Sequence, residues 1–194
     1  MRVLIACEES QEVCNAFRGV GHYAYSCDLK PCSGGHPEWH IQEDCCDVIH
    51  QEDWDFIGFH PDCTKMAVSG NRWYGKNTDR YIERIDSIIW TLSVWYQIKN
   101  IAKYAYLENP VSVIFSVPAM NNHQYVQPWQ FGHGETKKTG LELYNLPPLV
   151  PTQIVEGREQ RVWKMSPSEN RKELRSKTFP GIAKAMAMQW GSML

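Results

Sequence analysis

The sequence predicts an α/β fold with a doubly wound, mostly parallel sheet. Short apolar runs that suit strands alternate with segments of helical periodicity. The first thirty residues read as strand, helix and strand, a β-α-β unit whose crossover should be right-handed and whose strands should be parallel. A length of 194 residues with 43% hydrophobic residues suits one domain with a full core. We therefore expect a single domain over residues 1–194.

The elements are expected in a definite order. Glu8 or Ser10 can cap the first helix, which should end near Gly19 and Gly21 because glycine suits a helix C-terminus. A Gly- and Pro-rich loop follows the second strand, and a further helix should begin near Gly181. Strands are expected over residues 2–7, 22–28, 44–49, 54–60 and 104–107, the Gly/Pro loop over 30–40, and loops with one or two short strands over 145–170.

A long helix is expected between Thr78 and Asn100, where apolar side chains recur at helical spacing. Such a stripe is typical of core packing. Its members are Tyr81, Ile85, Ile88, Ile89, Leu92, Trp95 and Tyr96.

Charge and cysteine content restrict the class of protein. The net charge is −2, and all seven cysteines lie in the first third of the chain, an odd number that favours reduced thiols. No run approaches the ~18 apolar residues of a membrane span, and the start lacks the apolar core of a signal peptide, so we expect a cytoplasmic protein without a membrane partner. The tail, residues 158–177, leans basic, which suits either phosphate contacts or a solvated surface of mixed charge.

Polar residues stand at the expected carboxyl ends of the strands, where open α/β sheets bind ligands. An acid after the second strand is the usual partner of ribose hydroxyls. Together these residues indicate a nucleoside-containing cofactor beside a cysteine. They are Glu8 and Glu9 after the first strand, Asp28 after the second, Asp44 near the third, Pro61-Asp62-Cys63-Thr64 after the fourth and Glu108-Asn109-Pro110 after the fifth.

On these motifs the chain resembles the DNA cytosine-5 methyltransferases, especially the short phage-encoded members. The segment around Cys63 resembles the family's Pro-Pro-Cys-Gln nucleophile loop, and the segment at Glu108 resembles its Glu-Asn-Val motif. Looser similarities run through Thr136-Lys137-Lys138-Thr139, Ser168-Glu169-Asn170-Arg171, Thr178-Phe179-Pro180 and the helix from Gly181.

The resemblance implies a Rossmann-like, S-adenosylmethionine-dependent methyltransferase fold and methyl transfer to carbon 5 of cytosine in DNA. It implies Cys63, Glu108, Asn109 and Lys137 as catalytic residues. It also implies that the partner is DNA, either single-stranded or with its target base flipped out. Residues at about 145–170 would form a reduced target-recognition region. The resemblance further implies a phage protein in the bacterial cytoplasm that shields DNA from restriction. The implied cofactor-binding residues are Ile5, Ala6, Glu9, Ser10, Asp28 at the ribose, Leu29, Asp44 at the adenine, Cys45 and Pro61.

The chemistry explains why a thiol and a carboxyl group are needed. Carbon 5 of cytosine becomes nucleophilic once a thiolate adds to carbon 6. A carboxyl group at ring nitrogen 3 stabilises the product of that addition, best when it is protonated by burial. A free thiol has a pKa of ~8.5, so Cys63 needs a nearby cation. Lys65, Arg72 and Lys137 are the candidates.

Three departures from the family pattern keep a second function open. The Gly-rich first motif is replaced by Ala6-Cys7-Glu8-Glu9-Ser10, Asp62 stands where the family has proline, and the asparagine of the last motif is missing. A loop without glycine cannot bring its backbone as close to a cofactor, and the charge of Asp62 should raise the thiol pKa of Cys63. The alternative is a catalytically silent or repurposed nucleic-acid-binding protein, or a transferase that uses another base or donor.

Two further alternatives concern cysteines. Cys63 can be a buried structural cysteine, as free cysteine often is. Residues Cys32, His36 and His40, with Cys45 and Cys46, can form a zinc site, although the tight Cys-x-x-Cys pairs common in structural zinc sites are missing. The competing interpretation is that His36, Trp39 and His40 belong to a loop packed over the cofactor edge, and we expect no metal.

Overall fold

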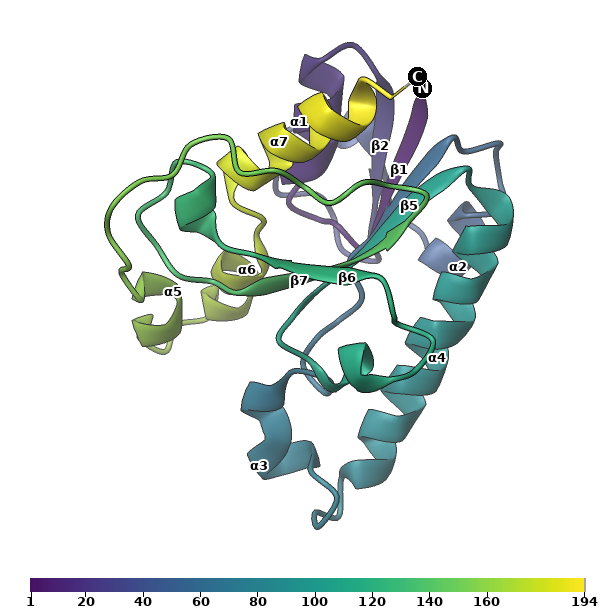
Figure 1. The fold of residues 1–194 in the computed structure, drawn as a ribbon. Coiled ribbons are helices and arrows are strands. Elements are labelled where there is room, and N and C mark those ends of the chain that lie inside the picture. The colour runs from purple at the N-terminus through teal and green to yellow at the C-terminus, as the bar shows by residue number, and fades with distance from the viewer. Residues whose placement is uncertain (194) are drawn as a thin grey trace.

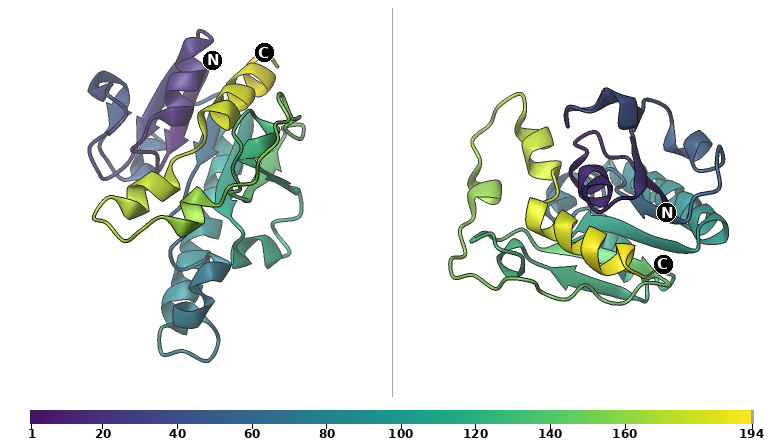
Figure 2. Two further views of the ribbon diagram at one scale, coloured as in Figure 1. Left: turned by 90° about the vertical axis from the view of Figure 1, so that its left-hand side faces the viewer. Right: turned by 90° about the horizontal axis from the view of Figure 1, so that it is seen from above.

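A twisted sheet forms the centre of the computed structural model, which describes residues 1–193 (Figures 1 and 2). The seven strands follow the order β3-β2-β1-β4-β5-β7-β6. Strands β1 to β5 are parallel neighbours, whereas β7 runs antiparallel to both β5 and β6. The strands are β1 (Arg2–Ala6), β2 (Tyr23–Cys27), β3 (His40–Ile41), β4 (Phe56–Phe59), β5 (Tyr104–Pro110), β6 (His123–Val126) and β7 (Thr139–Tyr144).

Helices cover both faces of this sheet. Helices α1 and α7 pack against each other on one face, and α2 and α4 lie on the other. The helices are α1 (Glu12–Gly19), α2 (Cys45–Val48), α3 (Asn71–Tyr74), α4 (Tyr81–Ile101), α5 (Arg161–Lys164), α6 (Arg171–Ser176) and α7 (Pro180–Gly191), with 3-10 turns at Pro37–Trp39, Val68–Gly70, Val113–Ser116 and Pro128–Gln130.

The central strands are apolar on both sides because both sides are covered. In β1, Val3 and Ile5 face the α1 and α7 side, whereas Leu4 and Ala6 face the α2 and α4 side, and all four are fully buried. This two-sided burial is the reason that parallel strands read as continuous apolar runs. The predicted doubly wound α/β fold is confirmed.

One predicted strand is wrong. Residues 44–49 are not a strand, because Asp44 N-caps helix α2 and its side chain accepts a hydrogen bond from Cys46 N at 2.9 Å. The third strand instead lies at His40–Ile41, inside the expected loop. The capping tendency of aspartate therefore outweighed the short apolar run that follows it.

The second half of the chain also differs from the prediction. Strands β6 and β7 were not expected, and residues 145–170 contain no strand. Among the described residues this region forms only isolated bridges, such as Phe131 with Gln153, and the short helix α5. In α4, Ile89 and Tyr96 of the predicted core stripe are 60% and 67% exposed. Tyr96 lies beside the buried Val94, Trp95 and Ile98, so it is exposed because it is on the side of the helix that faces away from the sheet.

None of the helices within residues 1–193 combines the length and apolar character that crossing a bilayer requires.

Candidate functional site

Three adjacent strands bring a thiol, a carboxyl group and an amine to one edge of the sheet. Cys63 follows β4, Glu108 lies near the end of β5 and Lys137 closely precedes β7. These strands are direct neighbours in the sheet. Glu108 and Lys137 line one cavity of about 10 Å³, close to the room that a single water needs. The other residues around it are Thr139, Thr178, Phe179, Ile182 and Met186.

Asn109 ties the cysteine loop to β5. Its side chain is fully buried, and Nδ2 donates a hydrogen bond to the Pro61 carbonyl at 3.1 Å. On the other side of Cys63, the chain turns back because the Cys63 carbonyl accepts hydrogen bonds from Met66 N and Ala67 N. The loop is therefore held at both ends. Asn109 therefore holds the cysteine loop through its Nδ2. Its Oδ1 has no hydrogen-bond partner among residues 1–193.

The Cys63 thiol is half-buried and is a weak acid in this state. Burial, together with the negative charges of Glu108 and Asp62, raises its pKa to about 11, whereas the charge of Lys137 opposes them. The expected effect of Asp62 on this thiol is therefore present. Cys63 is not part of the closed core.

Burial acts in opposite directions on the two partners of the thiol. It raises the pKa of the Glu108 carboxyl, against the opposing charge of Lys137, which favours the protonated acid. It lowers the pKa of the Lys137 amine, against the opposing charges of Glu108 and Cys63. The Lys137 Nζ donates hydrogen bonds to the carbonyls of Lys177 at 2.8 Å and Ser176 at 3.2 Å. The C-terminal segment after α6 thereby holds this amine.

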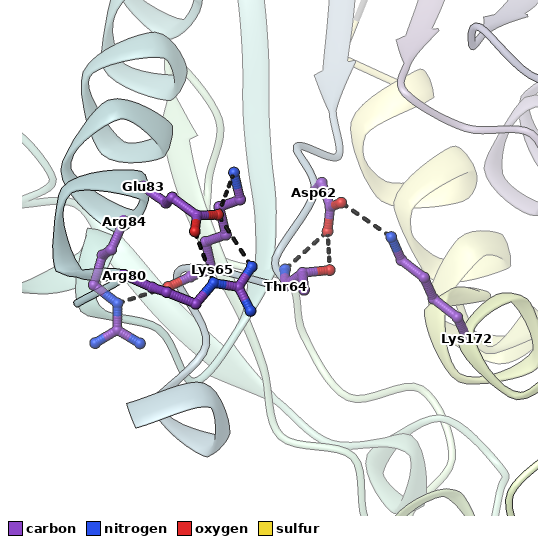
Figure 3. A network of polar contacts seen from close by, with 7 residues as sticks. All are labelled: Asp62, Thr64, Lys65, Arg80, Glu83, Arg84 and Lys172. Atoms are coloured by element: carbon purple, nitrogen blue, oxygen red, sulfur yellow. Dashed lines mark hydrogen bonds and ion pairs between the residues drawn. The ribbon is translucent and has the colours of Figure 1, made fainter. Parts of the chain in front are cut away.

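Of the three candidate cations, only Lys137 acts on the thiol. Figure 3 shows Lys65 beside Glu83 of α4, with which it forms an ion pair at 3.2 Å. Arg72 lies over the ring of Trp73 at 5.2 Å. The expectation that Lys65 or Arg72 lowers the thiol pKa is therefore not met.

Asp62 belongs to a polar network of its own (Figure 3). It accepts hydrogen bonds from the backbone N–H and the hydroxyl of Thr64, and it forms an ion pair with Lys172 of α6 at 3.0 Å. Although partial burial opposes it, these contacts lower the pKa of the Asp62 carboxyl. The ion pair brings a cation of the C-terminal segment to the residue next to Cys63, and no local sequence pattern indicates this contact.

A second contact missed from the sequence joins His60 and Tyr106. The His60 Nε2 and the Tyr106 hydroxyl are 2.7 Å apart, and His60 immediately precedes Pro61 of the cysteine loop. Burial, with the charge of Lys137, lowers the pKa of His60 to about 3, so this imidazole stays neutral. Tyr106 lies two positions before Glu108 in β5, on the same face of the strand, so strand periodicity could have indicated it.

The edge beside β1 and β2 carries the residues that were expected to hold an adenosine. Asp28 follows β2 and uses one carboxylate oxygen to accept a hydrogen bond from Lys30 N at 3.0 Å. Its other oxygen accepts none from the chain as described. Leu29 beside it is 70% exposed, which offers an apolar surface to a base. A free carboxylate oxygen can accept hydrogen bonds from ribose hydroxyls, and the exposed Leu29 side chain lies beside it.

At the same edge, the segment between β1 and α1 differs from the loop that binds a ligand in dinucleotide-binding folds. The buried carboxylate of Glu8 accepts hydrogen bonds from Val13 N at 2.7 Å and Cys14 N at 3.2 Å, the first amides of α1. In a dinucleotide-binding fold, these amides face the ligand. Burial raises the pKa of Glu8 to about 8. Of the two predicted caps of α1, Glu8 is therefore the one that contacts the amides of its first turn.

The loop 30–40 packs on the connection between β1 and α1. Ser33 donates a hydrogen bond from its backbone to the Glu9 carbonyl and another from its hydroxyl to the Glu9 carboxylate. Gln11 and His36 exchange two hydrogen bonds, and His36 stacks on Trp39 at 3.8 Å between ring centroids. This arrangement has the loop covering the edge where a cofactor is expected.

The remaining expected cofactor residues lie along the same edge with different exposure. Ile5 and Ala6 are fully buried in β1, so that only their backbone is available to a ligand, and Ser10, Cys45 and Pro61 are buried as well. Asp44 is exposed.

The predicted alternative of a zinc site in the 30–40 loop does not assemble. His40 contacts the Ser26 hydroxyl and the Lys30 carbonyl, and His36 is engaged with Trp39 and Glu38. In the described part of the chain, the one group of three metal-ligating side chains that meets is Asp44, Cys45 and Cys46, whose ligand atoms lie within 4.8 Å of one another.

Comparison with known proteins identifies the fold. No family model and no curated protein matches the sequence. The structure is similar to a protein described as a DNA modification methyltransferase encoded within a prophage (E. coli), with a TM-score of 0.52 and 11% identity over 86% of this chain and 55% of that chain. It is also similar to the Entamoeba histolytica methyltransferase EhMeth, with a TM-score of 0.53 and 12% identity over 82% of this chain and 57% of that chain.

The chain thus spans little more than half the length of these two structures. At such identity the likeness concerns the architecture. The chain has a Rossmann-like methyltransferase fold with a mostly parallel sheet of seven strands.

Proposed function

We propose that this chain transfers a methyl group from S-adenosylmethionine to carbon 5 of cytosine in DNA, through a covalent adduct of Cys63 with carbon 6. The observation that supports the proposal most is the convergence of Cys63, Glu108 and Lys137 from β4, β5 and β7. A thiol for addition, a carboxyl group whose pKa is raised by burial and an amine whose pKa is lowered by burial are groups that suit this reaction.

The proton of the thiol has a defined acceptor. In this proposal Lys137, whose pKa is lowered by burial, accepts the proton of Cys63 in the fraction of chains in which its amine is unprotonated, and the Ser176 and Lys177 carbonyls hold the resulting ammonium. The Cys63 sulfur then forms a bond to carbon 6 while protonated Glu108 donates its hydrogen bond to ring nitrogen 3. Carbon 5 thereby gains the electron pair with which it would bond to the methyl group of S-adenosylmethionine, as the bond between that methyl group and the cofactor sulfur breaks and S-adenosylhomocysteine leaves. When the proton of carbon 5 leaves to solvent, the bond between sulfur and carbon 6 breaks and the thiolate returns.

Asp28 and Leu29 would hold the adenosine part of the cofactor, with Asp44 and Cys45 beside the adenine and Pro61, Glu9 and Ser10 toward the reacting end. When bound, S-adenosylmethionine supplies the electrophilic methyl group. The backbone of Ile5 and Ala6 completes this side of the site. Asn109 acts as a positioning residue, because its hydrogen bond to the Pro61 carbonyl holds the cysteine loop against β5.

The DNA partner is expected to enter from the side of α6. This helix carries Lys172 and Arg175 near the Cys63 loop and Lys137, and such cations suit phosphate contacts. A base within a duplex cannot reach a thiol between strands, so the target is flipped out or single-stranded. Residues 145–170 serve as a reduced target-recognition region, and a phage origin with a role in protection from restriction suits these features.

The test is nucleoside mass spectrometry of DNA incubated with the chain and S-adenosylmethionine. We expect 5-methylcytosine from the parent and from Cys32→Ser, a matched control outside the site, and none from Cys63→Ser. A DNA containing 5-fluorocytosine should trap the adduct on Cys63, because fluorine cannot leave as a cation. Equal methylation by Cys63→Ser and the parent would refute the mechanism.

A second candidate function is a catalytically silent relative that binds nucleic acid, or a transferase with another donor or base. It is favoured by the thiol pKa of about 11 and by Glu8, which occupies the amides of α1. Calorimetry with S-adenosylmethionine separates the two functions. No heat of binding at millimolar cofactor, together with retention on DNA, supports the silent relative.

A further inference from the structure

Four metal-ligating side chains gather at the carboxyl edge of β1 and β2, and we call them the thiol cluster: Cys7, Asp44, Cys45 and Cys46. They come from two separate segments, the turn after β1 and the start of α2. The ligand atoms of Asp44, Cys45 and Cys46 lie within 4.8 Å of one another. The Cys7 Sγ lies 3.6 Å from the Cys45 Sγ.

The distance between these two sulfurs is informative. A disulfide would require about 2.05 Å between them. Two thiolates on one tetrahedral zinc ion, each at about 2.3 Å from the metal, lie roughly 3.8 Å apart. At the observed 3.6 Å the Cys7 thiol donates a hydrogen bond to the Cys45 Sγ, so no disulfide joins the two, and their spacing is also close to that of two thiolates on one zinc ion. Cys7 also has a left-handed backbone, with φ of 61°, which turns the chain sharply after β1.

The other cysteines are outside the thiol cluster. Cys27, at the end of β2, is fully buried and its Sγ donates a hydrogen bond to the Glu43 carbonyl at 3.3 Å. Cys14 is fully buried in α1. In contrast, Asp44 is exposed and Cys7 and Cys46 are half-buried, so that an ion can reach them from solvent.

We propose that the thiol cluster binds one thiophilic divalent cation, with Zn²⁺ as the best match, through Cys45, Cys46 and Asp44, with Cys7 as the fourth ligand. Thiolate sulfurs with one carboxylate oxygen suit Zn²⁺, which prefers four ligands in a tetrahedron. The three thiols release their protons to the buffer as the metal–sulfur bonds form. The Cys7 side chain turns about its single χ1 torsion to complete the set.

This inference goes beyond the proposed function, and it has a consequence for it. The thiol cluster contains Asp44 and Cys45, which lie at the proposed adenine end of the cofactor site. A chain loaded with metal should therefore reject the cofactor, and a chelator should restore binding. The two proposals remain separable, because metal binding is measured without S-adenosylmethionine and cofactor binding is measured in chelator.

The experiment titrates the full-length reduced chain with Zn²⁺, and with Co²⁺ as a spectroscopic probe. We expect one metal per chain and the intense visible absorption of tetrahedral Co²⁺ bound to thiolate. Cys45→Ser and Cys46→Ser should weaken binding by on the order of 100-fold or more, beyond what loss of an outer partner costs. Asp44→Asn should weaken it as well while keeping the N-cap of α2, because asparagine caps as well as aspartate.

Controls distinguish the thiol cluster from other sites. Cys32→Ser, in the 30–40 loop, and Cys63→Ser should bind the metal as the parent does. Circular dichroism reports whether Cys45→Ser folds, and Asp44→Asn carries the test if it does not. The proposal is overturned if the parent shows no Co²⁺–thiolate absorption, if Asp44→Asn and the folded cysteine variants keep parental affinity, or if Cys32→Ser or Cys63→Ser loses the metal instead.

Discussion

Replacing Asp62 by asparagine should make Cys63 more reactive. The Asp62 carboxylate raises the pKa of this thiol, which is about 11. At pH 8 only about one chain in 1,000 then carries the thiolate, since each pH unit below the pKa is a factor of ten. The amide side chain in Asp62→Asn keeps an oxygen for the Thr64 N–H but removes the charge, and the change frees Lys172 from its ion pair.

The size of the effect follows from the exposure of the pair. The Asp62 and Lys172 side chains are 61% and 68% exposed, so solvent screens their charges. Exposed charges interact by about 0–1 kcal/mol, and about 1.36 kcal/mol corresponds to one pKa unit. We therefore expect the thiol pKa to fall by roughly half a unit and the thiolate fraction at pH 8 to rise about threefold.

Alkylation by iodoacetamide, followed by peptide mass spectrometry, measures this change. The rate at Cys63 in Asp62→Asn should exceed that of the parent about threefold at pH 8, and both rates should rise with pH until about pH 11. Cys32 in the same molecule serves as the internal control and should not change. An unchanged or slower rate at Cys63 would refute the electrostatic reasoning.

Three other changes have outcomes that follow from the structure. Burial raises the pKa of Glu8 from 4.5 to about 8. Between about pH 4.5 and about pH 8 the folded state therefore keeps a proton that the unfolded state has lost, so the free energy of unfolding should fall as the pH rises through this range. Glu8→Gln should remove this fall, worth roughly 2–5 kcal/mol in thermal unfolding across that range, and an equal fall in both proteins would contradict it. Gly58→Ala would place a Cβ 2.6 Å from the Tyr106 ring, so it should lower the free energy of unfolding in urea by about 1–3 kcal/mol. Gly19→Ala is the control: its Cβ would meet nothing within 4 Å, and its free energy of unfolding should stay within about 0.5 kcal/mol of the parent. Asn109→Ala should leave the Pro61 carbonyl without its hydrogen bond and lower the free energy of unfolding by about 1–3 kcal/mol. It should also speed amide hydrogen exchange at residues 61–67. Unchanged exchange there would show that Asn109 does not hold the loop.

The sequence was sufficient for the parallel half of the sheet because parallel strands end at a common edge. Once β4 and β5 are recognised as apolar runs, Cys63 and Glu108 must follow them at that edge. The same reasoning failed at residues 44–49, where a few apolar residues suit a strand or a helix equally well and the cap at Asp44 decided the outcome.

Other features depend on contacts that local patterns do not encode. Strand β6 begins with His123 and Gln124, so it has no apolar run, and it becomes a strand only by pairing with β7. The ion pair between Lys172 and Asp62 joins residues 110 positions apart. Such a contact depends on where α6 docks, and charge composition alone gave only a basic-leaning tail.

The identity of residue 137 changes how the candidate site controls its protons. A looser similarity aligned the Thr136–Thr139 segment with an arginine-bearing motif, and an arginine stays protonated in any protein environment. A lysine does not, and the Lys137 amine is both desolvated and held by two carbonyls of the C-terminal segment. Lys137→Arg would therefore keep a cation beside Glu108 and Cys63 but remove the base. If Lys137 accepts the thiol proton, this variant should lose adduct formation on 5-fluorocytosine DNA near neutral pH and recover it as pH rises toward the thiol pKa. If the amine acts only as a fixed charge, Lys137→Arg should form the adduct with the pH profile of the parent.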